Sequence, residues 1–332
     1  MKNIRTVRLS RRLVQNLVLL VVLIGLITFF TAMNPRFLTH RNFINIVRQI
    51  LPQVLMGCAM TFVINSGAID LSVGGVMGLS AVFFAIFVTW GVNVWMALVF
   101  VCFLGAFVGV INTLIIHGFK LPAIMATMAT WIAGAGLAYV VCDAIPVKDP
   151  GIKPITELNN LMFFNDTVPL ALFIILVIVA VFIFLEKKTI VGKYAISIGG
   201  NENAVFLSGI NVARMRMIFF IFSGIMAALS GVWQVSRIGS GDPNIGIGLE
   251  FSVIAGCILG GVNIKGGDGS ITGMLIGTII LTILTNGMNM MGVNAFYQQV
   301  ATGVVILIAV LIMFLAGYIR GLRSKKQTVA CN

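Results

Sequence analysis

The chain has 332 residues, of which 59% are hydrophobic and only 10% are charged. Soluble domains carry about a quarter charged residues, so this composition excludes a soluble enzyme or binding domain. The net charge of +12 would suit nucleic acid, but the basic residues stand at the ends of apolar runs, which is typical of membrane topology. We therefore expect an all-α integral membrane protein, with residues 1–332 forming a single transmembrane domain. The alternating pattern of a β-barrel is missing from the sequence.

Apolar runs of about 20 residues, the length needed to cross a bilayer, recur along the chain. We expect about ten spans, at residues 12–32, 50–66, 71–90, 94–117, 121–142, 167–185, 215–237, 249–264, 271–291 and 297–319. Residues 36–48 are expected to lie at the membrane surface, because isoleucines stand beside Arg41 and Arg48. The first run is too long for a signal-peptide core and lacks a cleavage site, which indicates an uncleaved span.

Lysine and arginine are distributed unequally between the two expected sides of the membrane. With both termini inside, sixteen of the 22 basic residues face the cytoplasm and six face outward. This bias agrees with the positive-inside rule. The basic tail 320–332 and the loop 186–216 are then cytoplasmic.

The loop 186–216 is polar and charged, in contrast to the apolar runs around it. Asn201 is a good N-cap, Glu202 suits the positive end of a helix dipole, and Gly209 suits a left-handed helix stop. These residues predict a helix of about two turns, from Glu202 to Ser208. Because so short a helix is marginal alone, we expect it to dock on a partner.

Glycine is frequent, with 36 residues, and pairs such as Gly105/Gly109 and Gly273/Gly277 are four residues apart. Small residues one turn apart let helices approach closely in lipid. Packing within the bundle is the favoured interpretation. A surface for a second copy of the chain is the alternative.

Two acidic residues open expected helices a few residues after a glycine, in Asp70-Leu-Ser-Val and Glu250-Phe-Ser-Val. The two helices would run in opposite directions, as in the inverted repeats of transporters, although four matched positions also arise by chance. Each carboxylate can cap amides at a helix start, which we favour, or take part in proton or ion coupling.

Motifs for catalysis, metal binding and nucleotide binding are missing from the sequence. His40 and His117 stand alone, no cysteines form a Cys-x-x-Cys pair, and Gly192-Lys193 lacks the Ser or Thr that follows in a phosphate loop. The glycines of 260–269 are expected to form a tight cytoplasmic turn. A membrane pathway with a docking helix but no energy source fits a permease that a separate ATPase drives, and ATP and Mg²⁺ would bind that partner.

Four motifs resemble those of the ribose/xylose-type sugar permeases of ABC importers, in the branched-chain amino acid/ribose permease superfamily. They are Gly67-Ala-Ile-Asp-Leu-Ser-Val-Gly-Gly, Ile198-Gly-Gly-Asn-Glu-Asn-Ala with Leu207-Ser-Gly-Ile-Asn, Leu259-Gly-Gly-Val-Asn-Ile-Lys-Gly-Gly-Asp-Gly-Ser, and Asn286-Gly-Met-Asn. The similarity covers about residues 40–320. Ala68 and Asp268 depart from the family pattern, which leaves the substrate open.

The resemblance implies a helical bundle like that of type II ABC importers, such as the cobalamin importer, in a bacterial cytoplasmic membrane. It implies three protein partners: an ABC ATPase, a periplasmic or lipid-anchored sugar-binding protein, and a second permease copy. The segment that couples to the ATPase corresponds here to Gly199, Gly200, Asn201, Glu202, Ala204, Leu207, Ser208 and Gly209. The implied cargo is a monosaccharide, and the alternatives are a branched-chain amino acid permease or a passive channel.

Uncharged polar side chains in the spans are candidates to line the pathway, because they can hydrogen-bond sugar hydroxyls and release them again. The candidates are Asn65, Thr127, Thr130, Trp131, Gln234 and Gln298. For each of them, a role in helix packing is the competing interpretation.

Overall fold

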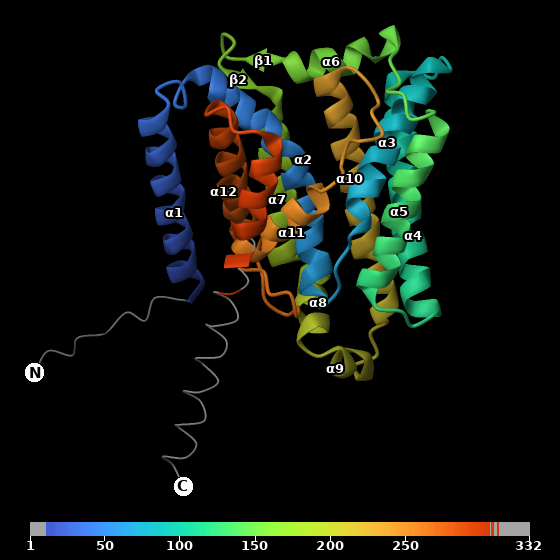
Figure 1. Cartoon of the computed structure of the whole chain (residues 1–332). Helices are drawn as coiled ribbons and strands as arrows, with labels where there is room; N and C mark the ends of the chain where they lie inside the picture. Colours follow the sequence, from blue (N-terminus) through green and yellow to red (C-terminus); the bar gives the residue numbers. More distant parts are fainter. Residues whose placement is uncertain (1–10, 306, 309–310, 312–332) are drawn as a thin grey trace, which may run out of the picture.

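The computed structural model describes residues 11–305, 307–308 and 311, which form a helical bundle (Figure 1). Seven of the described helices are long and apolar enough to cross a membrane. They are α2 (His40–Asn65), α3 (Ser72–Thr89), α4 (Val94–Gly118), α5 (Ala123–Val141), α7 (Leu170–Lys188), α10 (Val212–Ile238) and α12 (Ile271–Met290). The predicted multi-pass helical protein is thereby confirmed, and the count of ten spans stays a prediction.

Two further apolar helices differ from these seven. Helix α1 (Arg11–Met33) lies at the edge of the bundle against α12, where the ring of Phe30 covers Gly287. Helix α11 (Leu249–Leu259) has 11 residues, about 16 Å of helix, which is too short to cross a hydrocarbon core of about 30 Å. The expected span 249–264 is therefore wrong, because the chain turns after Leu259.

The end of the chain is described only in part. Residues 295–305 are helical, in agreement with the start of the expected last span. The remainder of the span 297–319 and the basic tail 320–332 lie outside the continuous described residues.

Helix α2 is one continuous helix of 26 residues, so the expectation that residues 36–48 lie along the membrane surface is wrong from His40 onward. Pro52 lies inside this helix and has no N–H to offer the carbonyl of Arg48. The indole of Trp233 donates to that carbonyl instead, at 3.1 Å. A contact from α10, 185 residues away, thus satisfies the carbonyl that the proline leaves free.

The two ends of the bundle differ in structure (Figure 1). One end, here the α6 end, carries the 3₁₀ turn η1 (Pro150–Ile152), α6 (Lys153–Asn160) and the antiparallel pair β1 (Met162–Phe163) and β2 (Val168–Pro169). The other, the α9 end, carries α8 (Ile190–Gly200) and α9 (Glu202–Leu207), which project beyond the long helices. The sequence predicted α9 but not α8.

Glycines allow α4 and α10 to touch through their backbones. A Cβ on Gly105 would meet the carbonyl of Gly224, a Cβ on Gly224 would meet the carbonyl of Gly105, and a Cβ on Gly109 would meet the carbonyl of Phe220. Gly277 likewise faces the carbonyl of Gly256 in α11. The favoured interpretation, packing within the bundle, is confirmed for these glycines.

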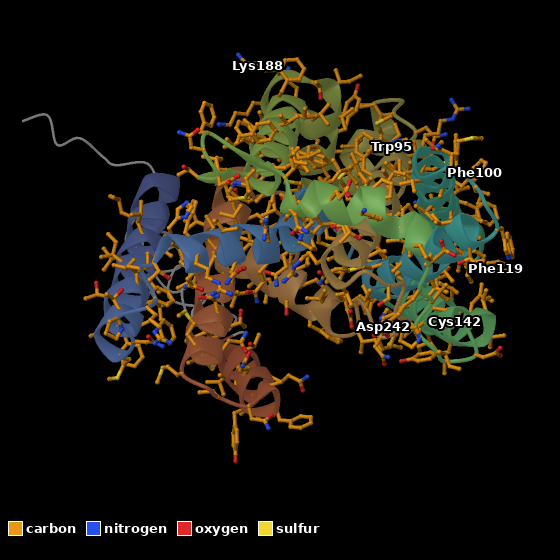
Figure 2. All side chains as sticks on the ribbon, turned by 90° about the horizontal axis from the view of Figure 1, so that it is seen from above. Trp95, Phe100, Phe119, Cys142, Lys188 and Asp242 are labelled. Atoms are coloured by element: carbon orange, nitrogen blue, oxygen red, sulfur yellow. The ribbon has the colours of Figure 1, made fainter. Side chains whose placement is uncertain are left out.

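Large apolar side chains cover the outer faces of several helices. Seen from the α6 end, Trp95 and Phe100 of α4 lie at the periphery of the bundle (Figure 2), and both are exposed. Exposed leucine, isoleucine and phenylalanine side chains also cover α5 and α7. Such faces suit contact with lipid chains.

Candidate functional site

Helix α9 has the ends that the sequence predicted. The side chain of Asn201 accepts a hydrogen bond from the N–H of Ala204 at 3.0 Å, and Gly209 has a φ of +82°. The N–H of Ile210 donates back to the carbonyl of Val205 at 3.4 Å, as in a Schellman stop. The N-cap and the left-handed glycine stop are therefore confirmed, and the helix itself ends at Leu207.

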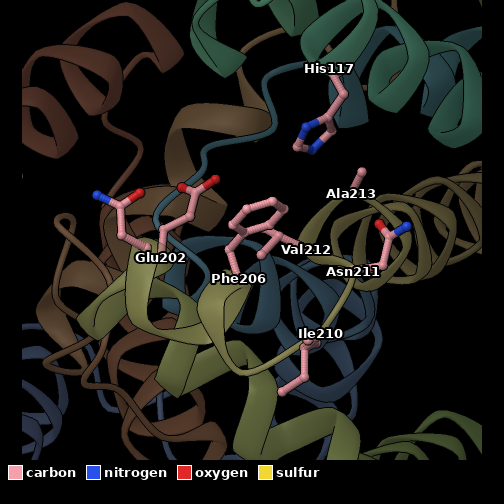
Figure 3. Close-up of a pocket in the computed structure, with 9 residues that line it drawn as sticks. His117, Glu202, Phe206, Ile210, Asn211, Val212 and Ala213 are labelled. Carbon is pink, nitrogen blue, oxygen red and sulfur yellow. The ribbon is translucent and has the colours of Figure 1, made fainter.

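The helix exposes two large apolar side chains, one of which, Phe206, lines a cavity beside it. Val205 is its single buried residue, whereas Phe206 is 67% and Leu207 is 84% exposed. Beside it, a cavity of about 550 Å³ lies between His117 at the end of α4, α9 and the start of α10 (Figure 3). Two exposed apolar side chains thus stand next to a cavity at the α9 end of the molecule.

An ion pair fastens α9 to the bundle. The guanidinium of Arg216 in α10 donates to both carboxylate oxygens of Glu202, at 3.0 and 2.7 Å. Its Nη2 also donates to the carbonyl of Ser66, at 3.0 Å, directly after the end of α2. Since a bidentate pair is geometrically specific, α9 is held in a fixed position relative to α2 and α10.

Three motifs that are far apart in the sequence meet beside this ion pair. The carbonyl of Asn65 accepts from the N–H of Gly267 at 2.9 Å. A Cβ on Gly199 would meet that same carbonyl, and a Cβ on Gly266 would meet the backbone of Gly67 and Gly199. Gly199 thus packs between backbones inside the bundle, whereas the Cβ position of Gly200 is open.

Asp70 is buried at the start of α3, within a polar network. Its Oδ1 accepts from the N–H of Ser72 at 2.9 Å and from the Ser72 hydroxyl. Asn112 of α4 donates to that hydroxyl at 2.9 Å and accepts from Thr130 of α5 at 2.7 Å. This bonding to a first-turn amide is the one that the capping hypothesis predicts.

Thr127 lies next to the same network and is fully buried. Its hydroxyl oxygen accepts from the N–H of Leu71 at 3.1 Å. Thr127 therefore ties α5 to the start of α3, and Thr130 ties α5 to Asn112 of α4. Trp131 lies on the same helix, and its backbone carbonyl faces Gly75.

Glu250 opens α11 and is buried against α3. Its Oε1 accepts from the N–H of Gly248 at 3.2 Å, and its other oxygen faces Gly74 in the first turn of α3. The start of α11 therefore meets the start of α3, and the two helices run in opposite directions along the bundle (Figure 1). The predicted opposite directions of the two acid-led helices are confirmed.

A second cavity, here the amide cavity, lies toward the α6 end between α2, α10, α11 and α12. It has a volume of about 250 Å³, and its polar lining residues are Gln49, Gln53, Gln234, Arg237 and Asn289. Gln298 reaches its edge, because its Nε2 donates to Oδ1 of Asn289 at 2.6 Å. Two of the pathway candidates, Gln234 and Gln298, thus come together here, whereas Asn65 lies at the α9 end.

Several residues at these sites were not among the predicted ones. Arg216, Asn112 and Arg237 carry no sequence signal of their own, since their partners come from other helices or lie in a cavity between helices, whereas Asn289 ends the predicted Asn286-Gly-Met-Asn motif. Asn286 belongs to a predicted motif, and it exchanges hydrogen bonds with Asn42 of α2 at 3.0 and 3.1 Å. Among the described residues, no group of three His, Cys, Asp or Glu side chains could hold a metal ion.

Comparison with known proteins assigns the chain to a family. Residues 42–315 match the family described as branched-chain amino acid transport system / permease component. The chain is 37% identical to the ribose import permease protein RbsC of Bacillus subtilis, over 86% of this chain and 89% of that protein. It is 33% identical to the L-arabinose transport system permease protein AraH of Escherichia coli, over 83% and 84%.

A further relative covers almost the whole chain. The probable ABC transporter permease protein YphD of Escherichia coli is 35% identical over 93% of this chain and 92% of that protein. No solved structure matches the chain. The predicted resemblance is confirmed: the chain belongs to the branched-chain amino acid transport system permease family, as an ABC transporter membrane subunit and not an enzyme.

Proposed function

We propose that the chain is the permease subunit of an ATP-driven ABC importer and forms the membrane pathway for a monosaccharide. A periplasmic or lipid-anchored binding protein delivers the sugar, and a second permease copy completes the pathway. Family membership and the similarity to a ribose and an arabinose permease support this cargo class. The α9 end and both termini face the cytoplasm of a bacterial cell, in line with the charge bias.

The observation that carries the proposal is the capped, exposed helix α9. Phe206 and Leu207 offer an apolar contact to the partner ATPase, which binds the ATP and Mg²⁺. When the ATPase closes on ATP, it displaces α9, and the ion pair of Glu202 with Arg216 transmits the displacement to α10 and to the end of α2. The pathway then alternates between its two openings.

The direct test is reconstitution with partners. The full-length chain, co-expressed with the ATPase from a neighbouring gene, is expected to co-purify with it and to support ATP-dependent uptake into proteoliposomes that contain the binding protein. A panel of labelled ribose, xylose, galactose and leucine identifies the cargo. Uptake without ATP would favour a passive channel, and uptake of leucine alone would favour an amino acid permease.

Gly209→Val is expected to uncouple transport while the protein still accumulates in the membrane. A β-branched residue is costly at a φ of +82°, although no neighbour lies within 4 Å of its Cβ position. The strain therefore shifts the end of α9 and not the core. We expect sugar uptake to fall at least tenfold in proteoliposomes, at an unchanged yield of purified permease.

Gly91→Val is the matched control for this variant. Gly91 has a φ of +79°, and its Cβ position is equally open, but it connects α3 and α4 at the α6 end. Near-normal uptake by Gly91→Val with a loss in Gly209→Val would assign the effect to α9. Wild-type uptake and ATPase stimulation by Gly209→Val would contradict the coupling assignment.

A further inference from the structure

The amide cavity is lined mainly by polar side chains, near the α6 end of three long helices. Gln49 and Gln53 belong to α2, Gln234 and Arg237 to α10, and Asn289 to α12, three helices that are each long and apolar enough to span the membrane. Polar and charged side chains inside a membrane face protein or water because exposure to lipid is costly. The cavity is therefore a water-accessible part of the molecule.

The free groups of the lining are mainly hydrogen-bond donors. Oε1 of Gln234 accepts from Nη1 of Arg237 at 2.8 Å, which turns the amide N–H₂ of Gln234 away from that bond. Oδ1 of Asn289 accepts from Gln298 at 2.6 Å, and Gln298 is oriented by a second bond to the carbonyl of Val293. Both amides therefore keep their N–H₂ groups for a ligand.

The amide of Gln53 in α2 also has its carbonyl oxygen occupied. The hydroxyl of Thr282 donates to its Oε1 at 3.1 Å. The guanidinium of Arg237 carries only hydrogen-bond donors, and several of its N–H groups remain after the bond to Gln234. Three amides with occupied carbonyls and one guanidinium give the cavity a surplus of donors.

The charge of the cavity is positive. Arg237 lies on its wall, and Arg48 lies near enough to act on Arg237 electrostatically. No carboxylate is among the described lining residues. Glu250, although it follows the lining residue Leu249, has its carboxylate oxygens at Gly248 and Gly74.

We propose that the amide cavity is a cargo-binding subsite for oxygen-rich, monosaccharide-sized solutes that are neutral or anionic, and that it rejects cationic ones. The inference rests on the proposed transport function and adds the chemical class that the permease itself admits. Hydroxyl, ring and carboxylate oxygens satisfy the free donors. An ammonium group brings more donors and a positive charge beside Arg237, and the uncharged amide oxygens of the described wall, that of Gln49 among them, supply no opposite charge to offset it.

The test measures binding to the purified full-length permease without its ATPase, so it does not depend on coupling. The probes are D-galactose, D-galacturonate and D-galactosamine at pH 6, where the amine is protonated, with saturation-transfer difference NMR as the readout. We expect clear signals from galacturonate and galactose and a signal at least fivefold weaker from galactosamine. Equal signals from all three, or no signal from any up to 50 mM (on the order of the weak binding expected of a site that must release its cargo), would overturn the proposal.

Variants of the lining residue Arg237 distinguish binding in the amide cavity from binding elsewhere on the permease. Arg237→Gln is expected to reduce the galacturonate signal at least fivefold and to remove most of the discrimination against galactosamine, whereas Arg237→Lys retains the discrimination. Gln299→Leu is the control, since Gln299 is an exposed neighbour of Gln298 outside the lining. An unchanged ratio of acid to amine in Arg237→Gln would overturn the subsite, while a failure of ATP-dependent uptake would count only against the proposed transport function.

Discussion

Leucine at Gly224 is expected to leave little or no folded permease in the membrane. The Cβ of any side chain there would overlap the carbonyl of Gly105, and the reverse holds at Gly105. Ordinary overpacking of a core costs about 1–3 kcal/mol because side chains can shift. Here the obstacle is a helix backbone, so α4 and α10 must separate along their contact. We expect at least a tenfold fall in monodisperse protein by fluorescence-detected size exclusion.

Gly136→Leu provides the control in the same chain. Gly136 lies in the middle of α5 with no neighbour within 4 Å of its Cβ position, so leucine there adds apolar surface toward open space. This variant should express and elute like the wild type. Normal recovery of the Gly224→Leu variant would mean that α4 and α10 do not pack as described.

Arg216→Glu is expected to abolish ATP-dependent uptake while the permease stays folded. The substitution removes both bonds to Glu202 and the bond to the carbonyl of Ser66, and it places two carboxylates side by side. The pair lies at the edge of the bundle, with the Glu202 side chain 48% and the Arg216 side chain 13% exposed, and an ion pair near the surface contributes only about 0–1 kcal/mol to stability. The loss should therefore appear as uptake per ATP hydrolysed, at least tenfold lower, and not as lost protein.

The reversed pair separates the ion pair from the anchor on α2. Glu202→Arg combined with Arg216→Glu restores the attraction, but a carboxylate at 216 cannot donate to the Ser66 carbonyl. We expect partial recovery of uptake, well above either single variant and below wild type. Lys188→Glu makes the same charge change at the exposed end of α7 and should be neutral. If the losses of uptake in the two single variants simply add in the double variant, the ion pair takes no part in coupling.

The parts of the fold that depend on neighbouring residues could be predicted from the sequence. Asn201 and Gly209 fix both ends of α9 through contacts within a few residues, so their chemistry is visible in one short stretch. The opposite directions of α3 and α11 follow from the order of the apolar runs. The glycine pairs predicted close helix contact, although not which helix each would meet.

Features that depend on distant residues could not be predicted. Hydropathy shows how long an apolar stretch is, but not whether the chain stays helical along it. The expected span 249–264 therefore runs past the end of α11 at Leu259. The isoleucines beside Arg41 and Arg48 suggested a surface segment before the span, whereas α2 continues through both arginines, and Trp233 of α10 bonds the carbonyl that Pro52 leaves free. Arg216 and Ser66 are 150 residues apart, and spacing alone gives no sign of their bond.

The surplus of hydrogen-bond donors in the amide cavity could not be predicted from the sequence for a related reason. Gln234 and Gln298 were selected as uncharged polar residues, and the sequence does not tell which side of each amide is already occupied. That depends on Arg237 and on the carbonyl of Val293. The chemistry offered to a ligand therefore emerges only when the neighbours are placed.

Helix α2 joins the two regions that the proposed function needs. Its 26 residues form a rod of about 39 Å, with Gln49 and Gln53 on the cavity wall and Asn65 at the crossing of three glycine-rich segments. When a rigid helix tilts about one of its ends, each residue is displaced in proportion to its distance from that end. A tilt of about 5° about the Asn65 end would move Gln49, which lies 16 residues or about 24 Å along the helix from Asn65, through roughly 2 Å, enough to break a hydrogen bond. Hydrogen bonds from Gln49 or Gln53 to a solute could then form or break without any rearrangement of the other residues that line the amide cavity.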